Sequence, residues 1–577
     1  MAKAEKSIQK LEDRLSKEEA PEGYLLGRGT NIGYVCFESD SAVVDGIANV
    51  FPVFFFLVAA LICMTTMNRM VEDQRTQIGI LKALGYSDGR VSFKFLFYSG
   101  SAAISGAIFG YFVGTHVFPF IIWTVYRIMY RAGKICFAFD PLLAVVSLIV
   151  SVLCSIGTAW LSCRKELGSN AATLMRPRAP KSGKRVFLEY VPFVWKRLSF
   201  LRKVAVRNIM RYKKRFFMMV LGIGGCTGLL LTGFGVKDSI VGVAEMQYDE
   251  VQLHDVNVLL QKEVDEQYLS DLELLRERGL DKYFVCQESS WDLVSGEDQK
   301  SVTTYTLPKE MTNEELSEFL CLKTSKGEIL SKPGTGEAVV TDKVAKILGI
   351  TKGSEVILRD SDQKEIVVRV TGIAVNYIYN YVFIDESTLT EQESMSYVPK
   401  SVYIKVSPGR SVKELTPKLM KLEGTANVSV VDDMVRRFNA MMKSMNLIVI
   451  LITSCAAGLA FIVLFNLTNI NITERIREIA TIKVLGFYPQ ETALYVFREN
   501  FVLTVLGSVV GLGMGVWLHS FVMSQITLDM VSFGVRIFPM SYVYAVSLTL
   551  LFSALVSLMM NGRLDNVSMT ESLKSVD

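Results

Sequence analysis

The sequence predicts a polytopic α-helical membrane protein with seven transmembrane helices and one mixed α/β extracytoplasmic domain. Of its 577 residues, 50% are hydrophobic and the mean hydropathy is +0.31, which soluble domains seldom combine with long apolar runs. Seven apolar runs are each long enough to cross about 30 Å of hydrocarbon. The fourth and fifth runs are separated by residues 237–443, a polar stretch long enough to fold as a domain.

The seven predicted spans are apolar runs bounded by charged or polar residues. They cover residues 48–69, 92–122, 139–162, 215–236, 444–468, 498–522 and 538–560. Glycines recur every four residues in the second and sixth spans, at Gly106, Gly110, Gly114, Gly507, Gly511 and Gly515. Such a ridge lets two helices approach closely, either as a sliding interface or as static packing.

The distribution of Lys and Arg predicts the orientation of the spans. The segment from Arg164 to Arg215 contains sixteen of these cations against two acidic residues, which places it in the cytoplasm by the positive-inside rule. The short loop with Arg127, Arg131 and Lys134 goes against the rule but holds fewer cations.

The predicted organisation has six parts. They are an extracytoplasmic helical tail (1–47), a first half of three spans (48–163), a basic cytoplasmic linker with an interfacial helix (164–214), the fourth span (215–236), an extracytoplasmic α/β domain (237–443), and a second half of three spans with a short cytoplasmic tail (444–577).

Two polar segments have a recognisable local character. Residues 1–20 carry apolar side chains at helical spacing and are either one arm of a coiled hairpin or a solvated helix. In the linker, residues 176–185 contain the Pro and Gly of an extended chain, and residues 198–215 form a basic amphipathic helix suited to anionic membrane lipids. Because this helix offers no aromatic stacking platform and leads directly into a span, we expect no nucleic-acid partner.

The region between the fourth and fifth spans shows a mixed α/β pattern from residue 337 to residue 387. Strands are predicted by the β-branched content of EAVVT, SEVILRD, EIVVRVTGIAV and YVFID. Between the first two, DKVAKILG is a short helix that Asp342 opens and Gly349 closes. Isolated acids such as Asp342 and Asp385 are expected to be helix caps or solvated turns.

Motifs for metal and nucleotide binding are missing from the sequence. It has no GxxxxGK[ST], HExxH or CxxC motif, and its three histidines lie far apart. We therefore expect no catalytic residue, no metal site, no enzyme activity and no cofactor bound by this chain.

Cys286 and Cys321 either pair, if they face an oxidising space, or remain two free thiols. Glu499, the clearest acid near a span, is expected to pair with the adjacent Arg498 at the membrane edge.

A charged segment occurs twice, each time between two apolar runs. Residues 73–86, DQRTQIGILKALGY, align without a gap with residues 474–487, ERIREIATIKVLGF, at a shift of 401 positions. The matched pairs are Asp73 and Glu474, Gln77 and Glu478, Ile78 and Ile479, Lys82 and Lys483, Leu84 and Leu485, Gly85 and Gly486, and Tyr86 and Phe487. The repeat predicts a duplicated membrane unit.

Both copies resemble the cytoplasmic motif of FtsX-like/MacB-type ABC transporter permeases. The resemblance rests on RTQIGILKALG and ERIREIATIKVLG, on VRNIMRYKKRFFMMVLGIGGCTGLLL, and on the α/β pattern of residues 337–387, and it covers most of residues 45–577. That family's repeat unit is one span, an outer domain and three further spans. The second half fits this unit. The first half has three spans with only 47 residues before them, so the sequence is either a shortened relative or a carboxyl-terminal piece of a longer chain.

The resemblance implies a multi-pass protein of a bacterial plasma membrane. Such permeases pair with a separate cytoplasmic ATPase dimer, which binds ATP and magnesium and moves short coupling helices in the permease. The motion reaches the outer domain, where family members either extrude lipid or peptide cargo or control an extracytoplasmic partner protein. The alternative, from a different class, is an ATPase-independent membrane receptor with an outer ligand-binding domain.

The resemblance also places the ATPase contact on the two repeated segments. Each mixes charges with an isoleucine suited to fill a groove in the partner. Gly85 and Gly486 are expected to end the two helices in a left-handed conformation. The candidate coupling residues are Arg75, Thr76, Gln77, Ile78, Gly79, Lys82, Leu84, Gly85, Glu474, Arg475, Arg477, Glu478, Ile479, Lys483, Leu485 and Gly486.

Overall fold

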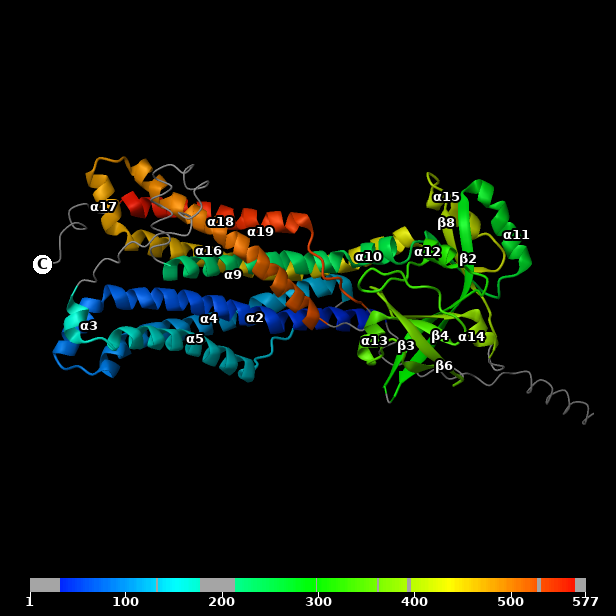
Figure 1. Cartoon of the computed structure of the whole chain (residues 1–577), viewed down its shortest axis with the longest axis horizontal. Helices are drawn as coiled ribbons and strands as arrows, with labels where there is room; N and C mark the ends of the chain where they lie inside the picture. Colours follow the sequence, from blue (N-terminus) through cyan, green and yellow to red (C-terminus); the bar gives the residue numbers. More distant parts are fainter. Residues whose placement is uncertain are drawn as a thin grey trace, which may run out of the picture.

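The computed structural model describes residues 32–130, 133–176, 213–296, 298–360, 363–391, 396–526 and 531–565. The predicted helix over residues 1–20 lies outside the described residues, and so do nearly all of the predicted linker (176–185) and interfacial helix (198–215). The molecule is elongated, with a bundle of long helices at one end and an α/β domain at the other (Figure 1).

Seven helices of the described chain are long and apolar enough to cross a membrane, and they coincide with the seven predicted spans. They are α2 (Ile32–Asp73), α4 (Asp88–Tyr130), α5 (Pro141–Leu167), α9 (Lys213–Val241), α16 (Val431–Glu474), α18 (Pro489–Gln525) and α19 (Pro539–Asp565). α2 begins well before the predicted first span. Residues 32–47 therefore continue that span as one helix.

Local sequence accounts for the start of several of these helices. Asp140 caps α5, because its Oδ1 accepts hydrogen bonds from the N–H groups of Leu142 (2.9 Å) and Leu143 (3.2 Å). Pro141 occupies the first turn, where a missing N–H leaves no hydrogen bond unmade. α18 likewise has a proline, Pro489, in its first turn.

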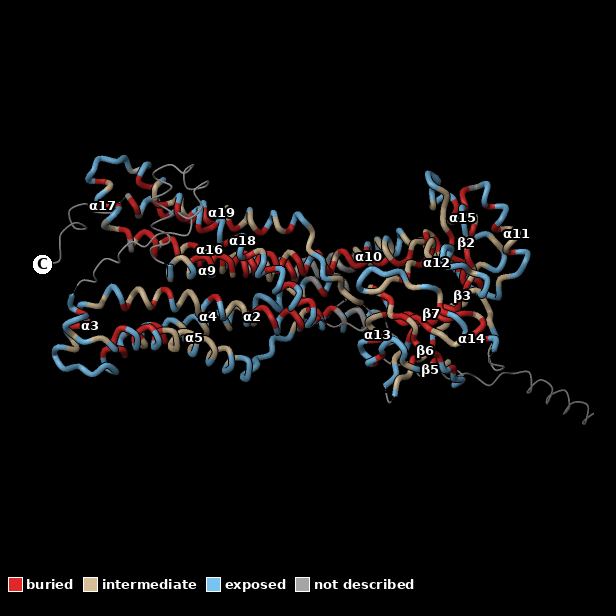
Figure 2. Tube along the Cα trace, viewed as in Figure 1, coloured by how far each residue is buried: buried red, intermediate tan, exposed pale blue. Residues whose placement is uncertain are grey.

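The two halves of the bundle repeat one arrangement. α2, α4 and α5 correspond to α16, α18 and α19, and the short helices α3 (Arg75–Ala83) and α17 (Ile476–Val484) follow α2 and α16. The halves meet where Arg69 Nη1 donates to the carbonyl of Ile470 (2.8 Å) and Asn466 Nδ2 donates to Thr66 Oγ1 (2.9 Å). α9 packs against α16 and α18 and is the most buried of the seven helices (Figure 2). The described part of the first half contains no counterpart of α9.

The two predicted glycine ridges have different surroundings. In α18, the ridge packs against α9 so closely that a Cβ added to Gly511 would lie 2.6 Å from the carbonyl oxygen of Gly224. In α4, a Cβ added to Gly106, Gly110 or Gly114 would have no described atom within 4 Å. The ridge of the sixth span therefore packs closely against another helix, whereas no described residue packs against the ridge of the second span.

The α/β domain, which we call the outer domain, contains a nine-stranded sheet in the order β3-β7-β4-β6-β5-β2-β8-β1-β9. Its strands are β1 (Val256–Leu260), β2 (Leu280–Ser295), β3 (Asp298–Leu307), β4 (Glu337–Thr341), β5 (Glu355–Arg359), β6 (Glu365–Ala374), β7 (Tyr381–Asp385), β8 (Ser401–Val406) and β9 (Thr425–Val430). The long strand β2 pairs with β3 and β5 in one lobe and with β8 in the other. It therefore joins two lobes that each have an apolar core.

Short helices cover this sheet and connect it to the bundle. They are α10 (Val243–Glu250), α11 (Glu266–Leu274), η3 (Arg276–Arg278), α12 (Asn313–Phe319), α13 (Asp342–Ile347), α14 (Glu386–Thr390) and α15 (Val412–Leu419), and α6 (Ala171–Met175) lies in the bundle. All four strands and the helix predicted between residues 337 and 387 are present as β4, α13, β5, β6 and β7. Asp342 begins α13, and Gly349 follows it with a φ of +63°.

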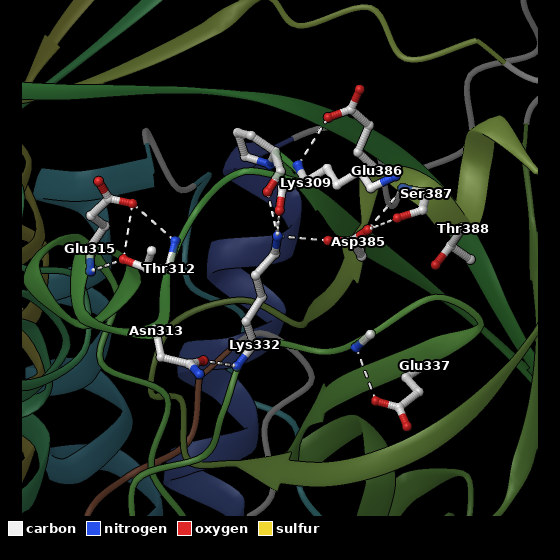
Figure 3. Close-up of polar contacts among 12 residues, drawn as sticks. Lys309, Thr312, Asn313, Glu315, Lys332, Glu337, Asp385, Glu386, Ser387 and Thr388 are labelled. Atoms are coloured by element: carbon white, nitrogen blue, oxygen red, sulfur yellow. Dashed lines mark hydrogen bonds and ion pairs between the residues drawn. The ribbon is translucent and has the colours of Figure 1, made fainter.

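Asp385 is a helix cap, as predicted, but it is buried and not solvated. Its Oδ1 accepts a hydrogen bond from the N–H of Ser387 (2.9 Å), and its Oδ2 lies 2.7 Å from Lys332 Nζ (Figure 3). Lys332 Nζ also donates to the carbonyls of Pro308 and Lys309. Burial raises the pKa of the Asp385 carboxyl, but the hydrogen bonds from Lys332 and Ser387 outweigh it, so the pKa lies below its usual value. This ion pair ties the chain before β4 to the end of β7.

A second polar cluster lies where the two lobes meet. Glu288 on β2 accepts hydrogen bonds from the Tyr403 hydroxyl and from Asn257 Nδ2 (3.4 Å). Burial raises the pKa of the Glu288 carboxyl to about 7, although hydrogen bonds, including that from Asn257, lower it. Nearby Cys286 is a buried free thiol and Cys321 is free as well, so of the two alternatives for these cysteines the structure has the unpaired one.

We expect the outer domain to lose stability as the pH rises from about 4.5 to about 7. The folded domain keeps the proton on Glu288 over this interval, whereas the unfolded chain has already released it. The free energy of unfolding should therefore fall by about 3 kcal/mol as the pH rises. Urea unfolding of the detergent-solubilised chain, followed by fluorescence in a variant that keeps Trp291, on the same strand, as its one tryptophan, measures this change. Glu288→Gln should flatten the pH dependence, and an undiminished slope in that variant would contradict the assignment.

Candidate functional site

α3 and α17 lie at the end of the bundle opposite the outer domain (Figure 1). Each follows its long helix after one residue that departs from helical geometry, Gln74 before α3 and Arg475 before α17. Each is followed by a left-handed glycine, Gly85 (φ +84°) or Gly486 (φ +91°). The predicted left-handed caps are therefore confirmed, and they turn the chain into the next span. We call α3 and α17 the coupling helices, after the role that the resemblance in sequence implies for them.

Ile78 and Ile479 do not face outward to a partner, and the prediction that they fill a partner's groove is wrong. Their side chains are 2% and 0% exposed. Ile78 packs in an apolar cluster with Val71 and Leu174, and Ile479 belongs to the central core of the second half. In sequence, an apolar residue on a short amphipathic helix looks the same whether it faces its own bundle or a partner. The two isoleucines anchor the coupling helices to the bundle.

Lys82 and Lys483 tie the coupling helices to the last span of each half. Lys82 Nζ donates to the carbonyls of Leu167, at the end of α5, and Ser169 (3.2 Å). Lys483 Nζ donates to the carbonyl of Leu564 (2.8 Å), near the end of α19. A cation at the carboxyl end of a helix satisfies carbonyls that have no partner within the helix.

Arg475 forms a buried ion pair with Glu499 on α18. Its Nη2 lies 2.6 Å from Glu499 Oε2, and the two side chains are 6% and 5% exposed. This corrects the predicted pairing of Glu499 with Arg498, which is exposed. Consecutive residues of a helix point about 100° apart, so neighbours in sequence rarely face the same partner. Arg475 therefore fixes α17 against α18 and is not accessible for a charge contact with another protein.

In the first half, α6 covers the coupling helix. Arg75 Nη2 donates to the carbonyl of Thr173 (2.9 Å), and its Nε lies 3.6 Å from a carboxylate oxygen of Glu166. A Cβ added to Gly79 would lie 2.8 Å from Met175 Cγ, so the glycine allows α3 and α6 to pack closely. Arg75 and Gly79 hold α3 in place from within this chain.

Each coupling helix exposes large apolar side chains at its carboxyl-terminal end. Leu84 and Leu485 are 69% and 71% exposed, and the exposed Tyr86 and Phe487 follow the left-handed glycines. We call these four residues the coupling tips. Sequence reasoning missed Tyr86 and Phe487 as site residues, although an aromatic residue after the cap glycine in both copies could have identified them.

The other predicted site residues lie in or just before the coupling helices. Thr76, Gln77 and Glu478 are exposed and available for polar contacts. Glu474 ends α16 and Arg477 lies in α17.

Residues 85–89 have the GxSxG spacing of hydrolase nucleophiles, but they join two helices, whereas that motif requires a strand before the turn. No three His, Cys, Asp or Glu side chains of the described chain are grouped so that they could hold a metal ion.

At the other end of the bundle, the outer domain is joined to α10 through Gln247. Its Oε1 accepts hydrogen bonds from the N–H groups of Tyr377 (2.9 Å) and Ile378 (3.1 Å), and its Nε2 donates to Asn376 Oδ1 (2.9 Å). Gln247 is 1% exposed. Because Gln247 and Asn376 are buried and paired, α10 and the loop before β7 are held in one geometry.

The segment between α18 and α19 contacts the same loop of the outer domain. The N–H of Ser532 donates to the carbonyl of Tyr377 (2.8 Å), and Lys343 Nζ donates to the carbonyl of Val531 (2.7 Å). At the end of this segment, the N–H of Phe538 donates a hydrogen bond to Asp238 of α9 (2.9 Å). This bond fixes the start of α19 against α9. We call these contacts, together with those of Gln247, the domain joint.

A comparison with protein families finds the same duplication that the two coupling helices show. Residues 49–171 and residues 450–563 both match the family described as FtsX-like permease C-terminal. The two matches begin 401 positions apart, which is the offset of the repeated segments. Each half of the chain therefore contains a segment that is similar to this permease family. Both coupling tips lie inside the matched segments, and α9 and the outer domain lie between them.

Two solved structures are similar to part of the chain. One is the periplasmic region of MacB from Actinobacillus actinomycetemcomitans, with 16% identity and a TM-score of 0.22, covering 32% of this chain and 93% of that chain. The other is the extracellular domain of the noncanonic ABC-type transporter YknZ from Gram-positive bacteria, with 15% identity and a TM-score of 0.21, covering 30% of this chain and 98% of that chain. The search of curated protein sequences found no match.

Proposed function

We propose that this permease is the membrane subunit of an ABC transporter driven by a separate cytoplasmic ATPase dimer, which binds ATP and magnesium. One ATPase protomer contacts each coupling tip on the cytoplasmic side of a bacterial plasma membrane, and the outer domain lies on the opposite side. The observation that carries the proposal is the pair of repeated short helices. Each is anchored to the bundle by a buried isoleucine and a lysine, and each presents an exposed apolar tip.

The chemistry of the tips suits contact with a protein. Leu84 with Tyr86, and Leu485 with Phe487, expose adjacent apolar side chains at the end of the bundle furthest from the outer domain. An aromatic and an aliphatic anchor that enter a pocket are typical of the residues that dominate binding energy at protein interfaces. The exposed polar side chains of Thr76, Gln77 and Glu478 can fix the register of such a contact.

α16 provides a direct mechanical connection between the two ends. It begins immediately after β9 of the outer domain and ends immediately before α17, so one uninterrupted helix of 44 residues links sheet and coupling helix. At 1.5 Å per residue its length is about 66 Å. A displacement of α17 therefore reaches the outer domain without crossing a flexible loop.

A second connection runs through α18 to the domain joint. α18 follows α17 after the Gly486 turn and is fixed to it by Arg475 and Glu499. At its far end, the chain contacts the outer domain through Val531 and Ser532. With α16 on one lobe and this segment on the other, relative motion of the two helices would change the angle between the lobes. We propose that this motion either controls an extracytoplasmic partner protein or expels lipid or peptide cargo at the outer face.

Replacing both exposed leucines, by Leu84→Asp with Leu485→Asp, should reduce co-purification of the ATPase by at least about ten-fold. A charge on each tip removes the apolar contact but leaves the anchoring residues in place. The measurement is pull-down from the native membrane, with the bound proteins identified by mass spectrometry and the ATP hydrolysis of the complex measured in parallel. Substitution of Ile78 or Ile479 is unsuitable for this test, since it would disrupt the core of the permease itself.

Leu274→Asp is the matched control, because Leu274 is equally exposed but lies on α11 of the outer domain. It should leave the association with the ATPase unchanged. If the tip variant retains its ATPase, the tips are not the contact. If the unmodified permease brings down no ATPase at all, the receptor class of function gains support and the proposed coupling is refuted.

A further inference from the structure

Glu288 lies where the long strand β2 passes from one lobe of the outer domain to the other. Up to Cys286, β2 pairs with β8, and from Gln287 onward it pairs with β3. We call the lobe of β1, β8 and β9 the β8 lobe, and the lobe of β3 to β7 the β3 lobe. Among the described strands, β2 is the only one that pairs with strands of both lobes. Any rotation of one lobe against the other therefore takes place about β2.

Side chains from both lobes meet at the Glu288 carboxyl group. From the β8 lobe, the Tyr403 hydroxyl and Asn257 Nδ2 (3.4 Å) donate hydrogen bonds to Glu288 Oε1. From the β3 lobe, Tyr305 lies opposite Glu288 in the register of β2 and β3, and its hydroxyl oxygen lies 3.0 Å from that of Tyr403. One chain of hydrogen bonds thus connects β2, β3 and β8.

The groups that donate to this carboxyl group are all neutral. Burial raises the pKa of Glu288, hydrogen bonds from Asn257 and Ser401 lower it, and no described cation contributes. His254, which precedes β1, packs edge-on against the Tyr403 ring with 4.5 Å between the ring centroids. Burial, together with the charge of a nearby lysine, lowers the pKa of His254 to about 3, so this side chain is uncharged near neutral pH.

The other titratable groups on the surrounding elements add no positive charge beside Glu288. Burial raises the pKa of one thiol and four phenols there, which are therefore neutral below about pH 8: Cys286, Tyr248, Tyr305, Tyr381 and Tyr397. Lys405 of β8 lies over the Phe319 ring of α12, 6.0 Å from its centroid. Asp255, which precedes β1, accepts a hydrogen bond from the N–H of Val406 (2.8 Å). Once ionised, Glu288 therefore carries a charge that no described cation balances.

We propose that Glu288 is a proton-controlled lock between the two lobes of the outer domain. While its carboxyl group holds a proton, the lobes stay closed as in the structure. After the proton is lost, the lobes rotate about β2 until water reaches the carboxylate. An unpaired charge is costly away from water, and opening the interface beside it removes that cost. The lock adds a response to pH to the proposed motion of the lobes, and it requires no ATPase.

The rotation that this lock requires is small. Glu288 is half-buried, so its carboxyl group lies at the margin of the interface between the lobes. The rest of that interface is an apolar cluster of buried side chains that includes Phe284, Phe319 and Tyr403. The rings of Phe284 and Phe319 pack edge to face, with 4.9 Å between their centroids. Water can therefore reach the carboxylate while this cluster stays closed.

The direction of the pH response follows from the affinity of the two forms for the proton. In the closed form, the pKa of Glu288 is raised from its ordinary value of 4.5 to about 7. In the open form, water returns the pKa toward the ordinary value. The closed form therefore gains most at acidic pH and loses its advantage as the pH rises through about 7. The ratio of closed to open molecules should fall about 70-fold between about pH 5 and about pH 8.

The test measures the distance between the lobes in the full chain, in lipid nanodiscs and without an ATPase. Spin labels are attached through a non-natural amino acid at Gln299 of β3 and Glu414 of α15, which are both exposed, so the native cysteines stay unmodified. We expect an open population that gains at least about ten-fold over the closed one between about pH 5 and about pH 8. Glu288→Gln should abolish this response and keep the lobes closed, because an amide cannot ionise.

Two further variants separate the lock from a purely structural role of Glu288. Asn257→Leu keeps the carboxyl group but removes a donor that lowers its pKa, so the pH of half-opening should move upward. Asp281→Asn is the matched control, because Asp281 is an exposed acid on the same strand, and it should leave the response unchanged.

The proposal is overturned if the unmodified chain shows one and the same distance population at both pH values, or if Glu288→Gln keeps the pH response. It is also overturned if circular dichroism shows that the sheet unfolds at the higher pH, since the change would then be unfolding and not opening.

Discussion

Gly511→Leu should force α9 away from α18 and destabilise the bundle by about 3 kcal/mol or more. Even a single added Cβ at this position would lie 2.6 Å from a carbonyl oxygen and 2.7 Å from Thr227 Cβ, and neither backbone can give way without moving its helix. Overpacking in a dense core is costly because neighbouring side chains leave their rotamers and the backbone shifts. Thermal unfolding of the purified chain in detergent, monitored by circular dichroism, measures the loss.

The same helix supplies the control for this substitution. Gly513, two residues away, faces open space among the described residues, so Gly513→Leu should leave the unfolding temperature nearly unchanged. Gly110→Leu, at the position equivalent to Gly511 in the first half, should be tolerated for the same reason when the chain is purified alone. Equal destabilisation by the substitutions at Gly511 and Gly513 would show that backbone contact with α9 is not what requires glycine.

Arg475→Met should destabilise the chain by about 3–5 kcal/mol, because it leaves the carboxylate of Glu499 buried without its cationic partner. The loss should also loosen α17 from α18 and so reduce binding of the ATPase. The double variant Arg475→Met with Glu499→Leu should regain most of the stability, since a buried ion pair and a well-packed apolar pair often differ little in free energy. Unfolding in detergent and ATPase pull-down are the two measurements.

An exposed ion pair on α2 is the comparison for this effect. Arg69 and Asp73 lie four residues apart with a distance of 3.3 Å, but the Asp73 side chain is 63% exposed. Asp73→Asn should therefore cost less than about 1 kcal/mol. If Arg475→Met costs no more than Asp73→Asn, water reaches the Arg475–Glu499 pair and it does not hold the coupling helix in place.

Local patterns were sufficient to predict most elements of this chain. The spans follow from runs of apolar residues, since a helix of about 20 such residues is needed wherever the chain crosses hydrocarbon. The strands and the helix from β4 to β7 follow from β-branched runs and from the turn residues between them. The left-handed caps at Gly85 and Gly486 follow from a glycine after an amphipathic helix, because only glycine adopts that conformation without strain.

The direction in which side chains of the coupling helices point could not be predicted in this way. Ile78 and Ile479 were expected to contact a partner but pack inside the bundle, and Arg475 was expected at an interface but pairs with Glu499. Whether an amphipathic face meets its own bundle or another protein depends on which helices lie beside it. Those neighbours lie outside the stretch that forms the coupling helix, as Leu174 beside Ile78 and Glu499 beside Arg475 illustrate.

The sequence alone determined the duplication, because the two copies of the charged segment can be aligned directly. It also determined the seven spans and the positions of the coupling helices, because each of these depends on the pattern of residues within one local stretch. It did not determine the different surroundings of Gly110 and Gly511. These glycines have equivalent places in the repeat, and only the position of α9 in space makes one a contact between two backbones and leaves the other bare. Only the tertiary structure shows which helix packs against a given glycine, because the sequence of one helix does not specify its neighbour.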